Sequence, residues 1–200
     1  MKENTVITIS RQYGSGGREI SQILAKKLNV HLYDRQIIHL AAAKLGINDL
    51  SEEALRDLEE NASPLSLGFM PFYAFGTHEG NMDSNLFVAE AKIVRKLAKD
   101  GPCVILGRCA DFVLRDFKEH YAFFICADDD YRTQRGQTVY GGKSLADLNN
   151  EDKKRAQYYE YYTGEKWGTA ENYDLTINTS KMTTEKAADM IIKYIEIMQK

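Results

Sequence analysis

The sequence predicts an α/β fold built on a parallel β-sheet with helices on both faces. Two observations point to this fold class. Strand-like and helix-like segments alternate along the 200 residues, which is typical of βαβ units. The runs at 103–106 and 122–126 are almost continuously apolar, as expected of central strands that are buried on both faces.

Two strands and three helices are predicted in the N-terminal third of the chain. The strands at 5–10 and 30–33 are short β-branched or apolar runs, and a glycine-rich turn at 14–17 follows the first. Helices are predicted where apolar residues recur at helical spacing or where a capping residue opens the segment. These helices cover about 18–28, 35–45 and 51–60.

Residues 63–80 differ in composition from the segments on either side, because they contain two prolines, three glycines and four aromatic side chains. We expect a long loop or an irregular arm there. The alternation then resumes, with strands predicted at 103–106, 121–126 and 175–178. Helices are predicted at 84–99, at 110–114, from 128 onward, at 145–162 and at 188–195.

The turn after the first strand is the most informative segment, because ligands bind beyond the carboxyl ends of parallel strands. Gly14, Ser15, Gly16 and Gly17 join this strand to the first helix. Glycines let backbone N–H groups wrap around an anion, and the helix N-terminus adds a positive dipole. The segments that follow the other strands, at 33–35, 107–108, 126–128 and 178–179, should share this edge.

Three interpretations of this turn remain open from the residues alone. A dinucleotide-binding G-x-G-x-x-G turn is favoured by Asp34, a candidate ribose ligand, but Glu19 stands where the third glycine belongs. A phosphate-binding loop fits the length better. Its pattern G-x-x-x-x-G-K-[ST] is not satisfied, because Arg11, Gly17 and Arg18 replace the first glycine, the lysine and the hydroxyl residue. The third interpretation is a glycine-rich turn without a ligand.

Four segments in sequence order resemble the cytidylate kinase-like family, at 7–20, 32–38, 104–111 and 173–180. The resemblance spans nearly the whole chain. It implies a three-layer P-loop NTPase fold of the nucleoside monophosphate (NMP) kinase type, with a five-stranded parallel sheet in one domain over 1–200. It also implies a small NMP-binding arm at about 35–83 and a lid region at about 136–170. Cytidylate kinases transfer a phosphoryl group from ATP·Mg²⁺ to CMP or dCMP.

The resemblance also implies roles for individual residues. The phosphate-binding loop would be Gly14, Ser15, Gly16 and Gly17. The acceptor monophosphate would be held by Asp34, Arg35 and Arg108. The basic helix after the fourth strand and the lid would contribute Arg132, Arg135, Asp152 and Arg155.

The sequence departs from the family pattern at the residues that carry charge. In true cytidylate kinases the loop lysine reaches the phosphates and the next hydroxyl binds Mg²⁺, whereas Gly17 and Arg18 stand here. We expect Arg11 and Arg18 to supply replacement charge as bidentate phosphate ligands, together with Arg108. Two further family aspartates are replaced by Leu106 and Cys126. For Mg²⁺ the candidate carboxylates are Asp34 and Asp128.

Several of these residues have an alternative structural role. Arg108 can simply pair with a neighbouring carboxylate, and the charged stretch 143–155 can be a solvated helix instead of a lid. The tyrosines at 158–162 and Trp167 either stack on a base or pack a helix onto the sheet. The aromatic run at 69–75 either lines the nucleobase pocket or forms a homodimer contact.

Composition narrows the classes of function. The chain has 26 Lys+Arg, 29 Asp+Glu and a net charge of −3, which argues against a general nucleic-acid-binding protein. No apolar stretch approaches the ~20 residues of a membrane span, and no signal sequence begins the chain, so we expect a cytoplasmic protein. Cys103, Cys109 and Cys126 form no metal-binding pair, and we expect buried free thiols.

The leading hypothesis is therefore a kinase that binds ATP and Mg²⁺ and phosphorylates CMP, dCMP or a related small acceptor. A competing hypothesis is a nucleotide-binding or regulatory protein that kept the fold and lost turnover. A dinucleotide-dependent oxidoreductase ranks third. In the first two cases the partner is a phosphate-bearing small molecule, held in a cationic cleft that the net charge of −3 conceals.

Overall fold

A computed structural model describes residues 2–34 and 82–200 of the chain. Four sequence predictions lie outside the described residues. These are the helices at 35–45 and 51–60, the arm with its aromatic run at 69–75, and the acceptor role of Arg35.

Five parallel strands form one sheet in the order β2-β3-β1-β4-β5. The strands are β1 Val6–Arg11, β2 His31–Tyr33, β3 Cys103–Leu106, β4 His120–Cys126 and β5 Leu175–Asn178. β1 lies at the centre, where Ile7 is in register with Val104 on one side and with Tyr121 on the other. This arrangement confirms the predicted parallel sheet and brings the carboxyl ends of all five strands to one edge.

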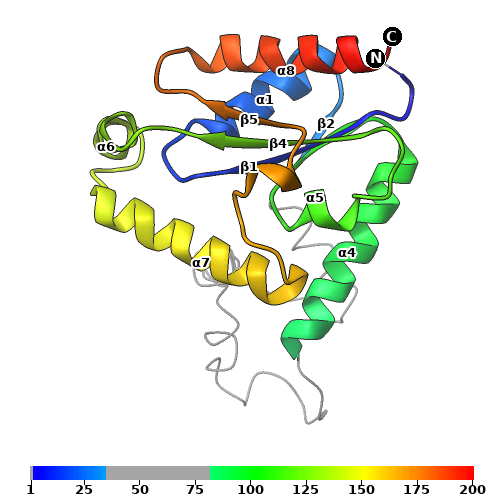
Figure 1. The fold of residues 1–200 in the computed structure, drawn as a ribbon, viewed down its shortest axis with the longest axis horizontal. Helices are drawn as coiled ribbons and strands as arrows, with labels where there is room; N and C mark the ends of the chain where they lie inside the picture. Colours follow the sequence, from blue (N-terminus) through cyan, green and yellow to red (C-terminus); the bar gives the residue numbers. More distant parts are fainter. Residues whose placement is uncertain (1, 35–81) are drawn as a thin grey trace.

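Helices cover both faces of the sheet (Figure 1). On one face lie α1 Gly17–Leu28 and α8 Thr184–Met198, and on the other α4 Met82–Asp100, α5 Ala110–Val113 and α7 Leu145–Thr163. The helix α6 Asp129–Thr138 follows β4, and a short 3-10 helix, Ala170–Asn172, precedes β5. α6 and α7 lie toward the carboxyl edge of the sheet (Figure 1), where the sequence analysis predicts the ligand-binding site.

The alternation of side chains along the strands divides the core into two layers. Ile7 and Ile9 pack with Ile20 of α1 and Ile191 of α8, whereas the intervening faces of β1 and β3 pack against α4 and α5. Burial of this kind contributes roughly 25 cal/mol per Å² of apolar surface. The core therefore fixes β1 and α1 on either side of the glycine-rich turn.

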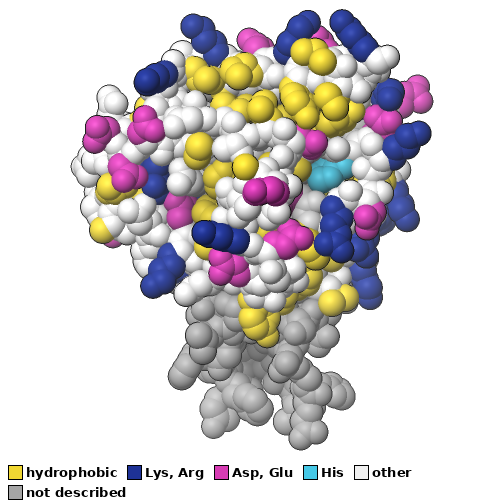
Figure 2. Space-filling view, viewed as in Figure 1, with side chains coloured by type: hydrophobic (Ala, Val, Ile, Leu, Met, Phe, Trp, Pro, Cys, Tyr) yellow, Lys and Arg dark blue, Asp and Glu magenta, His cyan; other side chains and the backbone are white. Residues whose placement is uncertain are grey.

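The charged surface and the cysteines can also be compared with the sequence predictions. Basic and acidic side chains are interspersed on the face shown in Figure 2. Within the described ranges, no helix combines the length and the apolar character required to cross a membrane. The three cysteines are free thiols; Cys103 and Cys109 are buried as predicted, and Cys126 is half-buried because it ends β4 at the open edge.

Candidate active site

The turn between β1 and α1 has the backbone of an anion-binding loop. Gly14 and Gly16 have φ angles of +85° and +84°, a left-handed conformation that glycine adopts without the steric penalty of a side chain. Gly16 is also the N-cap of α1. The first N–H groups of a helix have no partner within it, so this turn presents backbone donors at the positive end of the α1 dipole.

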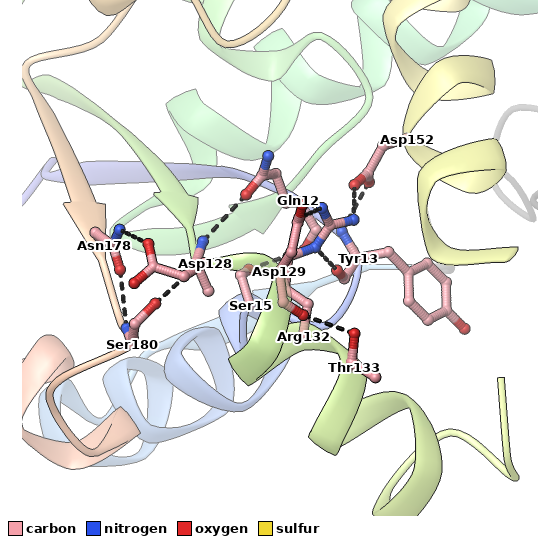
Figure 3. Close-up of polar contacts among 11 residues, drawn as sticks. Gln12, Tyr13, Ser15, Asp128, Asp129, Arg132, Thr133, Asp152, Asn178 and Ser180 are labelled. Atoms are coloured by element: carbon pink, nitrogen blue, oxygen red, sulfur yellow. Dashed lines mark hydrogen bonds and ion pairs between the residues drawn. The ribbon is translucent and has the colours of Figure 1, made fainter. Parts of the chain in front are cut away.

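Hydrogen bonds from distant segments hold the turn in place (Figure 3). The Ser15 hydroxyl donates to the Gln12 carbonyl at 2.8 Å, and Thr179 donates to the Ser15 carbonyl at 2.7 Å. The side chain of Gln12 accepts from the Ala127 N–H at 3.0 Å. Three strand ends are thereby tied to one loop, which favours a preorganised site.

Two charged side chains fasten the turn to α6 and α7. Asp152 Oδ1 accepts from the Tyr13 N–H at 2.7 Å, and Arg132 Nε donates to the Tyr13 carbonyl at 2.8 Å. Arg132 and Asp152 also form an ion pair of 2.6 Å, with side chains that are 4% and 12% exposed. These predicted basic-helix and lid residues are buried beneath the loop, where they support its backbone.

The other two residues predicted for this region lie at the side of the turn. Arg135 forms an ion pair of 2.6 Å with Glu19 in the first turn of α1. Arg155 pairs with Asp152 at 3.0 Å, and its guanidinium lies 4.9 Å from the centre of the Tyr13 ring. Arg155 lines the cleft described next, and Arg135 does not.

A cleft with a cavity volume of about 190 Å³ opens at the carboxyl edge of the sheet, above the turn. It is bordered by Gly14, Gly16 and Gly17 and by five basic but only two acidic side chains. The charged side chains are Arg11, Arg18, Arg108, Lys154 and Arg155 against Asp34 and Glu151. The predicted cationic cleft is therefore present in a protein whose net charge is −3.

Two of the predicted cleft arginines pair with carboxylates. Arg18 contacts Asp34 at 2.9 Å, and its side chain is 50% exposed. Arg108 lies 3.6 Å from Glu90 on α4, a carboxylate that is 1% exposed. Both pairs place a guanidinium at the cleft wall next to the end of a strand.

Two buried carboxylates lie beneath the cleft, and each accepts a hydrogen bond from a tyrosine of α7. Tyr158 donates to Glu90 at 2.9 Å, and Tyr159 donates to Asp111 at 2.7 Å. Burial raises the pKa of Glu90, and it raises the pKa of Asp111 to about 6. Both tyrosines also line the cleft. Their hydrogen bonds join α7 to α4 and α5, and Tyr159 is buried.

The sequence reasoning missed Glu90, Asp111 and Thr179 as parts of the site. Asp111 ends one of the four segments that carry the family resemblance, so its position was a usable signal. Thr179 follows the last strand at the predicted ligand edge. Glu90 has no such signal, because it lies within an ordinary helical pattern and reaches Arg108 only in the folded chain.

The two predicted metal ligands differ in their surroundings. Asp34 lines the cleft. Asp128 lies outside the cleft lining, and its carboxylate accepts from the Asn178 side chain at 2.8 Å, while its N–H donates to Ser180 (Figure 3). Over residues 2–34 and 82–200, no three His, Cys, Asp or Glu side chains gather as a metal site.

Comparisons with known proteins identify a family and several solved structures to which this chain is similar. The sequence model of the cytidylate kinase-like family matches residues 6–181. An uncharacterized protein from Eubacterium ventriosum ATCC 27560 is 30% identical, with a TM-score of 0.72, over 96% of this chain and 98% of that one. Among curated proteins, no sequence match is found.

More distant solved structures share the fold. A gluconokinase from Sinorhizobium meliloti 1021 has a TM-score of 0.57 at 10% identity, over 99% of this chain and 95% of that one. Shikimate kinase from Acinetobacter baumannii has a TM-score of 0.51 at 14% identity, over 96% and 92%. These likenesses are to small-molecule kinases. The strand order also differs from the 3-2-1-4-5-6 order of dinucleotide-binding folds.

Proposed function

The chain belongs to the cytidylate kinase-like family, and on that premise we propose that it transfers the γ-phosphoryl group of ATP to CMP, dCMP or a related small acceptor. The observation that carries this proposal is the turn at Gly14–Gly17. This turn leads into the N-terminus of α1 and lies at the floor of a cleft that is lined by five basic side chains. Helix N-termini and basic side chains together bind phosphates.

In this proposal the donor and the acceptor approach from opposite sides of the cleft. The turn holds the phosphates of ATP, with Arg11 and Arg18 supplying charge. Arg108, at the end of β3, holds the acceptor phosphate together with Arg35. An acceptor oxygen forms a bond to the γ-phosphorus while the bond to the β–γ bridging oxygen breaks, and ADP leaves with that electron pair.

Catalysis of this reaction depends on positioning and on charge neutralisation. The buried ion pair of Arg132 with Asp152 and the bond from Thr179 to Ser15 fix the loop before the nucleotide arrives. Such preorganisation reduces the ordering that binding would otherwise require. Mg²⁺ would neutralise phosphate charge when bound, and proteins hold it through one or two carboxylates together with substrate phosphates. Asp34 fits that description, because its carboxylate lines the cleft.

A second candidate function is nucleotide binding without turnover. It is favoured by one observation: neither the loop lysine nor the following hydroxyl is present, and Arg18 in that place pairs with Asp34 at 2.9 Å. Removing a single transition-state cation from a phosphoryl-transfer enzyme lowers the rate by about 10³–10⁵.

One assay separates the two candidates. Purified protein is incubated with ATP, Mg²⁺ and each nucleoside monophosphate in turn, and ADP formation is measured together with nucleotide binding by calorimetry. We expect ADP formation that depends on the acceptor and is greatest with CMP or dCMP. Binding of ATP without turnover for every acceptor would instead establish the second candidate. The proposal further places the protein in the cytoplasm, where both nucleotides are available.

A further inference from the structure

The side chain of Arg11 runs along the cleft across the faces of two glycines. A Cβ atom added to Gly17 would lie 2.5 Å from Arg11 Cβ and 2.9 Å from Arg11 Cγ. A Cβ atom added to Gly107 would lie 2.4 Å from Arg11 Nη1. A Cβ contact below 3.0 Å is essentially never found, so the Cβ and Cγ atoms of Arg11 exclude a side chain at position 17. At position 107 the clash is with the movable end of Arg11, and the φ of +73° there favours glycine by itself.

Backbone conformation does not explain the glycine at position 17. Gly17 is the first residue of α1, and its φ is not among the positive values found at Gly14 and Gly16. An ordinary side chain would therefore be accommodated by the backbone and is excluded only by Arg11. Side chains at positions 11 and 17 are mutually exclusive, because the clash begins at their Cβ atoms.

This exclusion explains the departure from the phosphate-loop pattern. The pattern places a glycine at position 11 and a lysine at position 17, whereas this chain has Arg11 and Gly17. One long basic side chain and one glycine are retained, with their places exchanged. Building on the proposed function, we propose that Arg11 performs the task of the missing lysine, from the first position of the loop pattern instead of the seventh.

The location of the guanidinium supports this assignment. Arg11 starts beside the phosphate loop and reaches Gly107, which directly precedes Arg108. β1 and β3 are neighbouring strands, and the Gly107 N–H donates to the Ile9 carbonyl at 2.9 Å. The charge of Arg11 thus lies between the donor loop and the acceptor side of the cleft. A planar guanidinium there can bind two oxygens of the phosphoryl group in transfer.

Arg18, the other candidate, is placed differently. It follows Gly17 in the first turn of α1, pairs with Asp34, and is half exposed. The carboxylate that it contacts is the one that the proposed function assigns to the metal, and its side chain starts from α1 and not from the end of β1. We therefore assign the lysine-like role to Arg11 and a supporting electrostatic role to Arg18.

The test is an exchange of the two residues in the full-length protein. The affinity for AMPPNP with Mg²⁺ is measured by calorimetry, and the Tm by scanning, for wild type, Arg11→Gly, Gly17→Lys and the double variant. Arg115→Gly is the matched control, because Arg115 is 58% exposed and lies outside the cleft lining. We expect Arg11→Gly to weaken binding by about 10- to 100-fold, as loss of a charge-assisted hydrogen bond does.

The double variant gives the decisive comparison. Gly17→Lys alone should lower the Tm by about 5 °C, because it overpacks against Arg11. Adding Arg11→Gly should restore that Tm and also recover affinity, because the lysine then stands in its usual place. Unchanged affinity in Arg11→Gly, or a double variant that binds no better than Arg11→Gly, would overturn the inference alone. A wild-type protein that does not bind AMPPNP would overturn the proposed function and, with it, the role of Arg11.

Discussion

Asp152 of α7 accepts a hydrogen bond of 2.6 Å from Arg132 of α6 in the interior of the protein. The two side chains also bind the N–H and the carbonyl of Tyr13, immediately before the glycine-rich turn. One buried ion pair thus joins two helices to the backbone of the phosphate loop. The folded stability of the protein and the shape of its loop are therefore coupled.

Replacing Asp152 with Ala should be strongly destabilising. The substitution removes the buried carboxylate partner of the Arg132 guanidinium and leaves it only the exposed Asp129, 3.3 Å away. Breaking a buried ion pair in this way typically costs about 3–5 kcal/mol. Urea unfolding measures the loss. Glu196→Ala is the control, because it breaks an exposed pair of 3.2 Å with Lys193 that contributes at most about 1 kcal/mol. Similar losses in the two variants would contradict the role assigned to the buried pair.

Thr179→Val should weaken both folding and nucleotide binding. It keeps the shape of the side chain but removes the hydroxyl that donates to the Ser15 carbonyl, leaving a buried acceptor unpaired at about 1–3 kcal/mol. The matched control is Thr138→Val, whose exposed hydroxyl donates to Gln134 within one helix. Unfolding curves and AMPPNP titrations of both variants check this. Equal losses of stability and affinity in the two variants would show that the hydrogen bond from Thr179 to Ser15 contributes little.

Much of the fold was readable from the sequence, because it depends on local patterns. The β-branched run of β1 and the apolar runs of β3 and β4 predicted central strands, and the five strands are parallel as expected. The turn at Gly14–Gly17 was found from its glycines alone. Each of these signals lies within about ten residues of chain, where periodicity and turn chemistry act.

The site was less predictable, because its contacts join residues far apart in the chain. Thr179 reaches Ser15 across 164 positions, and Asp152 reaches Tyr13 across 139. Asp152 was assigned to the lid by resemblance, yet it lies beneath the loop. The steric exclusion between Arg11 and Gly17 depends on how closely the folded turn brings these two backbone positions together, which the sequence pattern alone does not give.

Asp111→Asn should alter how stability depends on pH. Burial raises the pKa of Asp111 from 3.8 to about 6, so its favourable contribution is complete below pH 4 and is lost as the pH rises through 6. At higher pH the buried charge costs up to about 3 kcal/mol, since one pKa unit is about 1.4 kcal/mol. The stability of Asp111→Asn relative to wild type should therefore increase between pH 4 and pH 7.

The comparison of variant with wild type is needed because His120 acts in the opposite direction. Burial lowers the pKa of His120 from 6.5 to about 4, so its contribution is present above pH 6.5 and is lost as the pH falls through 4. The two effects oppose each other in the wild-type profile. Urea unfolding at several pH values checks the difference, and a difference that stays constant with pH would contradict the Asp111 assignment.

Arg108→Ala should impair the acceptor more than the donor. Arg108 lies at the end of β3, and we propose that it holds the acceptor phosphate, so its loss should raise KM for the acceptor by about 10- to 100-fold. KM for ATP should change far less. Steady-state kinetics with each substrate varied in turn checks this, with Arg115→Ala as the control, and an equal rise in both KM values would contradict the assignment.

Arg108→Ala also has a consequence for stability. Arg108 lowers the pKa of buried Glu90, which burial raises. Without the arginine that carboxylate is harder to ionise, so the variant should lose more stability at pH 8 than at pH 5. Tm measurements at both pH values test this, and an equal Tm change at each would show that the pair with Glu90 contributes little.

The central claim is that the turn at Gly14–Gly17 binds the phosphates of a nucleotide. A crystal structure with AMPPNP, Mg²⁺ and CMP tests it most directly. We expect the β- and γ-phosphate oxygens at about 2.7–3.2 Å from N–H groups of the turn and from the Arg11 guanidinium. A phosphate chain bound elsewhere, with the turn contacting no phosphate, would contradict the claim.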